Sequence, residues 1–263
     1  MATTVLPDDP RLALLRGLGR GAASSADVLV LEGELVLARA RAAGVVPSLV
    51  VAAASVAERL PPFDARTQVL TMDERAIGEL AGFEFHRGVL AVAERPAATP
   101  SNAAIAALHE RPRLRLLALD RIADAANLGA VLRCARAFDI GAVLLGPGCA
   151  DAWSRRCLRA SMGHGLSLSC SRVDDLAAAM QRCRVVLPGL RWWSTRGDGD
   201  APPLGTIAAP DRLGLVLGNE GDGVSTAVTT ACDAAVRIAM AAEVDSLNVG
   251  AAAAVLLWAL RMA

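Results

Sequence analysis

The sequence predicts an α/β protein in two parts: a small α/β unit at the front and, behind it, a parallel sheet with helices on both faces. Short apolar runs alternate with segments of helical spacing through most of the 263 residues, the pattern of strands joined by crossover helices. One apolar run, at 213–217, breaks into a loop with glycines at positions 218, 221 and 223. A glycine-rich loop between a buried strand and a helix is a common ligand site at the carboxyl edge of such a sheet.

The front unit is expected to occupy residues 1–96. Its apolar runs predict strands at 28–31, 47–52, 68–72 and 88–93, and its helical spacing predicts helices at 11–20, 34–43 and 73–80. Proline, alanine, threonine and serine dominate residues 96–102, a composition typical of a linker. We therefore expect a linker over residues 97–112.

The second unit is expected to occupy residues 113–263. The same patterns predict strands at 114–119, 142–145, 185–187, 213–217 and 236–240, and helices at 127–138, 154–161, 174–184 and 246–262. Alternation of this kind favours a parallel sheet buried on both faces.

Composition limits the function classes. The formal net charge is zero and every basic residue except three histidines is arginine, so contact with nucleic acid must come from a local patch. Six cysteines without a C-x-x-C pair argue against a zinc site or a disulfide framework, and for reduced thiols in the cytoplasm. The first residues lack the features of a signal peptide. The apolar stretch near the carboxyl terminus is shorter than a membrane span and predicts a buried helix.

The glycine loop at 218–223 is the first candidate site. Its G-x-x-G-x-G order differs from the dinucleotide fingerprint, and it lacks the Gly-Lys-Ser/Thr of a P-loop. Glu220 lies between the first two glycines and would repel a phosphate, so the loop suits a cationic ligand or one with hydroxyl and amine donors. Ser225 is expected to cap the helix that follows. The alternative is a tight turn required only by packing of the sheet.

Two other segments carry polar residues in apolar surroundings. Asn127 is expected to cap the helix that contains Arg133, whose neighbours are apolar. The plainer interpretation of Arg133 is an arginine that reaches the surface or pairs with a nearby aspartate. Asp245 or Ser246 can cap the last helix, which leaves Asn248 as an unusual residue in its first turn or as a second capping group.

Arginine-rich segments form the third kind of candidate. They supply Arg155, Arg156, Arg159, Arg191 and Arg196. Tryptophans 192 and 193 lie between the last two, and arginine interleaved with tryptophan suits phosphate pairing plus base stacking. The alternative is a solvated helix face and a buried tryptophan pair.

Taken in order, these segments resemble the SpoU/TrmH family of RNA 2′-O-ribose methyltransferases, in the SPOUT superfamily. Three motifs carry the resemblance: Asn127-x-Gly-x-x-x-Arg133, Gly218-x-Glu-Gly-x-Gly-x-Ser225, and residues 238–249 with Ile238, Met240 and Ser-Leu-Asn-Val. The segment 159–163 also matches a family segment. Residues 32–33 and 85–92 resemble the ribosomal-protein-L30-like RNA-binding domain that many members carry.

The resemblance implies a trefoil knot, S-adenosylmethionine as the cofactor, tRNA or rRNA as the substrate, and a homodimer without membrane attachment. It implies Arg133 as the catalytic residue. Because a guanidinium ordinarily stays protonated, Arg133 acts either as a base that a nearby group makes possible or, as we favour, through positioning and electrostatics while another group accepts the proton. Asn127, Glu220, Ser246 and Asn248 would hold Arg133 and the ribose. The cofactor positions would be Leu217, Gly218, Asn219, Gly221, Ile238, Met240 and Leu247. Two positions depart from the family pattern: Gly250, often serine, and Ala239, often proline.

Two further function classes stay open at this point. One is a catalytically inactive RNA-binding or ribosome-assembly module on the same fold, which the intact motif residues argue against. The other is a nucleotide-dependent oxidoreductase, which the glycine order disfavours.

Overall fold

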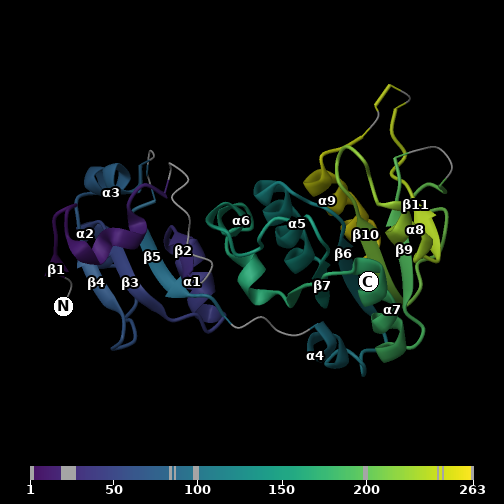
Figure 1. Ribbon diagram of the computed structural model, residues 1–263, viewed down its shortest axis with the longest axis horizontal. Coiled ribbons are helices and arrows are strands. Elements are labelled where there is room, and N and C mark those ends of the chain that lie inside the picture. Colours follow the sequence, from purple (N-terminus) through teal and green to yellow (C-terminus); the bar gives the residue numbers. More distant parts are fainter. Residues whose placement is uncertain are drawn as a thin grey trace. The chain divides into compact units, whose positions relative to one another are not determined.

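The computed structural model describes residues 3–18, 28–82, 85, 87–96, 101–197, 201–241, 243–244 and 246–261. The chain divides into two compact units (Figure 1). The first consists of Met1–Ala97 together with Trp153–Ser167, and the second of Ala98–Ala152 with Leu168–Ala263. The segment Trp153–Ser167, expected in the second unit, therefore packs with the first. The expected linker contains a helix, α4 (Ser101–Ala106).

The first unit is built on a five-stranded sheet of order β1-β4-β3-β5-β2. Strand β5 runs antiparallel to β2 and β3, whereas the other pairs are parallel. The elements are β1 (Thr3–Thr4), η1 (Pro10–Leu15), β2 (Val28–Glu32), α1 (Glu34–Ala42), β3 (Pro47–Ala52), α2 (Ala54–Ala57), β4 (Gln68–Thr71), α3 (Glu74–Ala81), β5 (Val89–Glu94), α6 (Arg155–Ala160) and η3 (His164–Ser167).

The second unit is built on a six-stranded sheet of order β11-β9-β10-β6-β7-β8. Every strand pair in it is parallel, which confirms the predicted parallel sheet. Besides α4, its elements are β6 (Leu114–Leu119), α5 (Ala125–Ala137), β7 (Ala142–Leu145), β8 (Cys170–Arg172), α7 (Leu176–Val186), β9 (Arg191–Thr195), β10 (Arg212–Leu217), α8 (Thr226–Thr230), β11 (Ala234–Val236) and α9 (Val249–Ala259).

Alternation along β6 sends side chains to two helical layers. Leu114, Leu116 and Ala118 join one core cluster with α4, α7 and α8. The intervening residues face the opposite side of the sheet because successive strand side chains alternate, and there α5 and α9 pack against each other. Arg115 is buried on that side and donates to the carbonyl oxygen of Leu260, just beyond α9, at 2.6 Å. The sheet is thus covered on both faces.

The sequence prediction is wrong at one strand, misplaces the last strand and misses β8 and β9. Residues 185–187 were expected to form a strand, but Val185 lies in the last turn of α7 and is exposed. A short apolar run cannot by itself distinguish a strand from a helix end. The strand in this region is β9, which contains Trp192 and Trp193. The last strand ends at Val236, four residues before its expected end.

Candidate functional site

A cavity of about 700 Å³ lies where strands β9, β10 and β11 end. The three strands are parallel, so their carboxyl ends meet at one edge of the sheet, which is where α/β folds bind ligands. Three segments after these strands and the start of α9 form the wall. The lining residues are Thr195–Gly197, Leu217–Val224, Thr226, Thr229, Thr230, Val236, Ile238, Met240, Ser246, Leu247, Val249, Ala252 and Leu256.

The glycine loop forms one wall of the cavity and is folded back on itself. The backbones of Asn219 and Gly223 exchange two hydrogen bonds, of 3.1 and 2.9 Å. The Oδ1 atom of Asn219 also accepts from the N–H groups of Gly221 and Asp222. A Cβ atom on Gly218 would lie 2.2 Å from the carbonyl carbon of Gly223. Glycine is required at 218 because the two ends of the loop approach too closely for a side chain.

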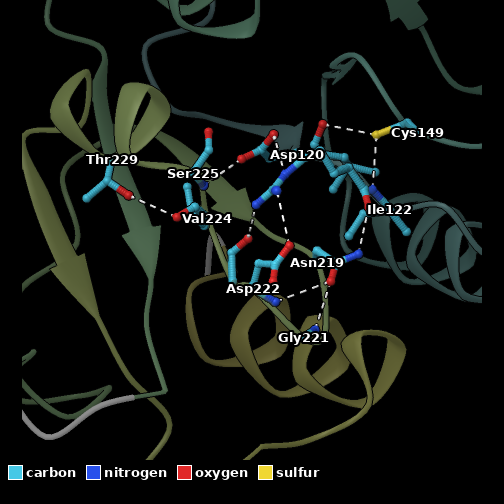
Figure 2. Close-up of polar contacts among 12 residues, drawn as sticks. Asp120, Ile122, Cys149, Asn219, Gly221, Asp222, Val224, Ser225 and Thr229 are labelled. Carbon is cyan, nitrogen blue, oxygen red and sulfur yellow. Dashed lines mark hydrogen bonds and ion pairs between the residues drawn. The ribbon is translucent and has the colours of Figure 1, made fainter.

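The loop that follows β6 holds the glycine loop in place. Figure 2 shows Asp120 and Ser225 facing one another, and the Ser225 N–H donates to Oδ2 of Asp120 at 2.7 Å. Arg121 pairs with Asp222 at 3.2 Å and donates to the carbonyl oxygen of Gly223. The Asn219 side-chain amide donates to the Arg121 carbonyl oxygen at 3.1 Å. Ser225 occupies the N-cap position of α8, but its side chain makes no capping bond.

A chain of side-chain amides joins the start of α9 to Glu220. Asn248 is the N-cap of α9, and its Oδ1 accepts from the N–H groups of Gly250 and Ala251. Because that oxygen is occupied, the Asn248 amide nitrogen is the donor to Oδ1 of Asn127, at 2.9 Å. The Asn127 amide nitrogen in turn donates to Oε1 of Glu220. The donors all point the same way, an arrangement in which hydrogen bonds reinforce one another.

Two capping predictions change in this region. Asp124, rather than Asn127, caps α5, since its carboxylate accepts from the N–H groups of Ala126 and Asn127. Asn127 is therefore inside the first turn, which frees its side chain for Glu220. Asn248 is the cap of α9, and Asp245 lies outside the described residues.

Gly250 lets α9 approach α5. A Cβ atom at this position would lie 2.8 Å from the Cβ of Ala130 and 3.1 Å from the Oδ1 of Asn248. A serine here would therefore press on α5 and on the capping oxygen. The glycine that departs from the family pattern fits this close contact between the two helices.

Arg133 stands apart from this network. Its side chain is exposed, it does not line the cavity, and among the described residues it makes no hydrogen bond or ion pair. Asn127 and Arg133 are six residues apart on α5, which at 3.6 residues per turn puts them on different sides of the helix. Within one chain, the arginine and the Asn127–Glu220 pair are therefore not brought together.

The cavity has the charge and surface expected for a small cationic ligand. Glu220 and Asp222 place two carboxylates in its wall against the single guanidinium of Arg196. Ile238, Met240 and Leu247 supply apolar surface, and threonine hydroxyls supply polar contacts. Its volume falls in the usual range for pockets that bury small molecules.

The structure places the expected cofactor positions together. All seven line the cavity: Leu217, Gly218, Asn219, Gly221, Ile238, Met240 and Leu247. Glu220 and Ser246 also line it, whereas Asn127 and Asn248 lie behind Glu220. Sequence reasoning missed Thr195 and the α8 threonines, because β9 and α8 carry no motif and reach the cavity only through the fold.

The arginine-rich segments separate into different surroundings. Arg155 and Arg159 pair with Glu32 in the first unit, and Arg156 is exposed. Arg191 pairs with Asp233 at 3.1 Å, and Arg196 lines the cavity. Trp192 and Trp193 are buried in the sheet, and the Trp192 ring N–H donates to the Met180 carbonyl oxygen. The expectation that they stack on bases is wrong; the buried-pair alternative holds.

The described part of the chain contains no cluster of three or more histidine, cysteine or acidic side chains able to hold a metal ion. No helix in the described ranges combines the length and apolarity needed to cross a bilayer.

Comparison with known proteins identifies relatives. The model of the SpoU rRNA Methylase family matches residues 115–258. A tRNA/rRNA methyltransferase of Mycobacterium bovis, itself uncharacterized, is 33% identical over 260 residues, covering 94% of this chain and 87% of the relative. The 23S rRNA (guanosine(2553)-2′-O)-methyltransferase RlmP of Bacillus subtilis is 32% identical over 153 residues, 56% of this chain and 58% of RlmP.

Solved structures agree with these matches. An RNA 2′-O ribose methyltransferase superimposes with a TM-score of 0.78 at 26% identity, over 99% of this chain and 98% of that structure. The SpoU methyltransferase AviRb of Streptomyces viridochromogenes, in complex with S-adenosylmethionine, has the same fold, with a TM-score of 0.79 at 22% identity over 96% and 97% of the two chains. The family match, the relatives and the cavity at the carboxyl edge of the parallel sheet lead to one conclusion: the chain belongs to the SpoU rRNA methylase family of S-adenosylmethionine-dependent RNA methyltransferases.

Proposed function

We propose that this protein methylates a ribose 2′-hydroxyl of tRNA or rRNA, with S-adenosylmethionine bound in the cavity of the second unit. The observation that carries the proposal is the meeting of two features at Glu220. Glu220 lines the cavity together with the seven expected cofactor positions. It also accepts the last hydrogen bond of the amide chain that runs from Asn248 through Asn127. A ligand site and an oriented carboxylate at one point are what methylation of a hydroxyl requires.

The cavity suits the cofactor. S-adenosylmethionine supplies an electrophilic methyl group on a positively charged sulfur, and the Glu220 carboxylate in the wall favours such a cation. The absence of a side chain at Gly218 lets the loop close on Gly223, and the folded loop forms the wall against which the ligand would lie. Ile238, Met240 and Leu247 provide the apolar surface that excludes water from the reacting atoms.

Glu220 and Arg133 receive different roles. Asn127 holds the Oε1 atom of Glu220, and we assign the other carboxylate oxygen to the ribose hydroxyl, whose proton must be removed or shared for the oxygen to attack. A guanidinium group has hydrogen-bond donors and no acceptor, so Arg133 is not assigned as the base. Its role is to orient the ribose and its phosphate, since a guanidinium matches phosphate geometry. Ser246, which also lines the cavity, completes the contacts to the ribose.

The trefoil knot belongs to the same proposal. After β11 the chain pairs with the segment between β9 and β10: the N–H of Arg237 donates to Pro202, and the N–H of Leu204 donates to Arg237. The chain then passes the carboxyl ends of the strands to reach α9, on the α5 side of the sheet. A path that runs along one loop and returns across the sheet is the course that a threaded carboxyl terminus would take.

We propose a homodimer in which Arg133 acts at the cavity of the partner copy. Arg133 is exposed and lies away from its own cavity, although the motif that contains it is intact. Helix α9 also exposes Val255 and Trp258, with 40% and 57% of their surfaces accessible. An exposed apolar helix face of this kind is suited to cover by a second copy.

The first unit supplies RNA binding in this proposal, as an L30-like domain, and the protein acts in the cytoplasm.

The experiment that tests the proposed function is methyl transfer from labelled S-adenosylmethionine to bulk tRNA and rRNA, followed by nuclease digestion and mass spectrometry of the nucleosides. We expect 2′-O-methylated nucleosides. A product methylated only on a base would contradict the ribose as acceptor. RNA binding without transfer would indicate the inactive module.

A further inference from the structure

Three arginines surround one buried glutamate in the first unit. Glu32, at the end of β2, has 4% of its side chain exposed. The Nη1 atom of Arg155 lies 3.2 Å from its Oε2, and Nε of Arg87 and Nη1 of Arg159 each lie 3.8 Å from its Oε1. All four residues belong to the same compact unit.

The cluster holds more positive charge than the glutamate needs. A buried carboxylate requires a partner, and Arg155, which donates to it, already provides one. The other two guanidinium groups leave the four side chains with a formal excess of two positive charges. The Arg87 and Arg159 side chains are 40% and 52% exposed. Both side chains therefore reach solvent.

The segment Trp153–Ser167 brings two of the three arginines to this place. It contains three arginines and no carboxylate. Leu158 is buried in a core cluster of the first unit, and the Arg39 guanidinium donates to the Met162 carbonyl oxygen at 2.7 Å. These contacts fix α6 on β2, so that Arg155 and Arg159 are held at Glu32 rather than spread over a mobile surface.

We propose that Glu32 organises Arg87, Arg155 and Arg159 into a binding site for the phosphate groups of the RNA substrate. Planar guanidinium groups bind phosphate oxygens through paired hydrogen bonds. The chain has no net charge, so its attraction for RNA must come from a local excess such as this one. The inference rests on the proposed function, in that the substrate is RNA, and extends it by naming a site in the first unit, whereas the cavity belongs to the second.

Glu32→Gln gives the decisive experiment, with Glu34→Gln as its matched control. Both substitutions remove one negative charge, and Glu34 is an exposed neighbour that pairs with Arg59. If only net charge matters, both variants bind end-labelled tRNA and rRNA more tightly. If Glu32 positions the arginines, Glu32→Gln weakens RNA binding about fivefold or more while Glu34→Gln does not. Binding of S-adenosylmethionine, measured by calorimetry, stays unchanged in both.

Arg87→Ala and Arg159→Ala test the site without touching the buried carboxylate, and they decide the matter if Glu32→Gln fails to fold. Each is expected to weaken RNA binding and to reduce the slope of log Kd against log salt by about 0.7–0.9, the loss of one phosphate contact. Unchanged slopes, or a Glu32→Gln protein that binds RNA as tightly as Glu34→Gln, overturn the proposal. The proposed function is judged separately, by the transfer assay described above. If wild-type protein forms 2′-O-methyl nucleosides there, the proposed function stands even when this phosphate site fails.

Discussion

The side-chain amide of Asn248 donates to the side-chain Oδ1 of Asn127 at 2.9 Å, which joins the N-terminus of α9 to a residue 121 positions earlier in α5. The same Asn248 caps α9 through its own side-chain Oδ1, which accepts from the Gly250 N–H. One residue therefore holds a helix end and, through Asn127, the carboxylate of Glu220.

Asn248→Asp separates these two roles. Aspartate caps a helix as well as asparagine does, but a carboxylate has no hydrogen to donate to Asn127. We expect methyl transfer to fall at least tenfold with the free energy of unfolding nearly unchanged. Asn248→Ala should lose transfer and also about 1 kcal/mol of stability. Urea unfolding and a transfer assay check both; an active Asn248→Asp enzyme would remove the amide chain from the mechanism.

Arg133→Ala should abolish turnover and leave cofactor binding intact. The loss of a positioned cation near developing charge costs a factor on the order of 100 or more in rate. Arg136→Ala is the matched control, because Arg136 is also an exposed arginine of α5 and has no role in the proposed site. Single-turnover kinetics and calorimetry with S-adenosylmethionine separate the two steps. Lost cofactor binding in Arg133→Ala would place this arginine in a different role.

Mixed dimers test whether Arg133 serves the partner copy. Co-expressed Arg133→Ala and Glu220→Gln chains form some dimers in which one cavity has its own Glu220 and the partner's Arg133. About half of the dimers are mixed, each with one complete site of two, so about a quarter of wild-type activity should return. Activity equal to the mean of the two separate variants would show that each chain uses its own arginine.

Arg121→Ala should weaken cofactor binding more than it slows transfer. Arg121 pairs with Asp222 and donates to Gly223, and it adopts a φ of 59°, a conformation that a non-glycine residue rarely takes. Without the Arg121 side chain the glycine loop loses the ion pair at Asp222 and the hydrogen bond at the Gly223 carbonyl oxygen. We expect the Kd of S-adenosylmethionine to rise about tenfold, which corresponds to about 1.4 kcal/mol. A higher KM with kcat reduced less than threefold confirms the assignment, and an unchanged Kd contradicts it.

The ionisation of Asp233 makes the free energy of unfolding depend on pH. Burial raises the pKa of its carboxyl, but hydrogen bonds from Arg184, the Trp192 N–H and Arg191 outweigh this and hold that pKa below its usual value. The carboxylate therefore stabilises the fold fully above the unfolded-state pKa, and this contribution is lost as the pH falls through the folded-state pKa. Asp233→Asn should cost about 1–3 kcal/mol at pH 7. The difference from wild type should shrink in urea titrations at decreasing pH; a constant difference would contradict the sign.

Much of the fold could be predicted from local patterns. The run Ala142–Leu145 is apolar throughout and Leu114–Leu119 is apolar except for Arg115, because both faces of a parallel strand are buried. Strand β9 was not predicted because its buried tryptophan pair lies between an arginine and a threonine, so the segment is not a continuous apolar run. Residues 185–187 were wrongly predicted as a strand because an apolar helix end has the same local pattern as a short strand.

The sequence by itself determined the parallel α/β fold and the family, and it selected seven residues that all line the cavity, because motif residues and buried strands are encoded by near neighbours in the chain. Only the tertiary structure decided which residues meet. It joined Asn127, Glu220 and Asn248, moved the α6 arginines to Glu32, and left Arg133 outside its own cavity. The physical reason is that these contacts depend on strand order and on helix packing between segments more than 90 residues apart, which no local pattern records.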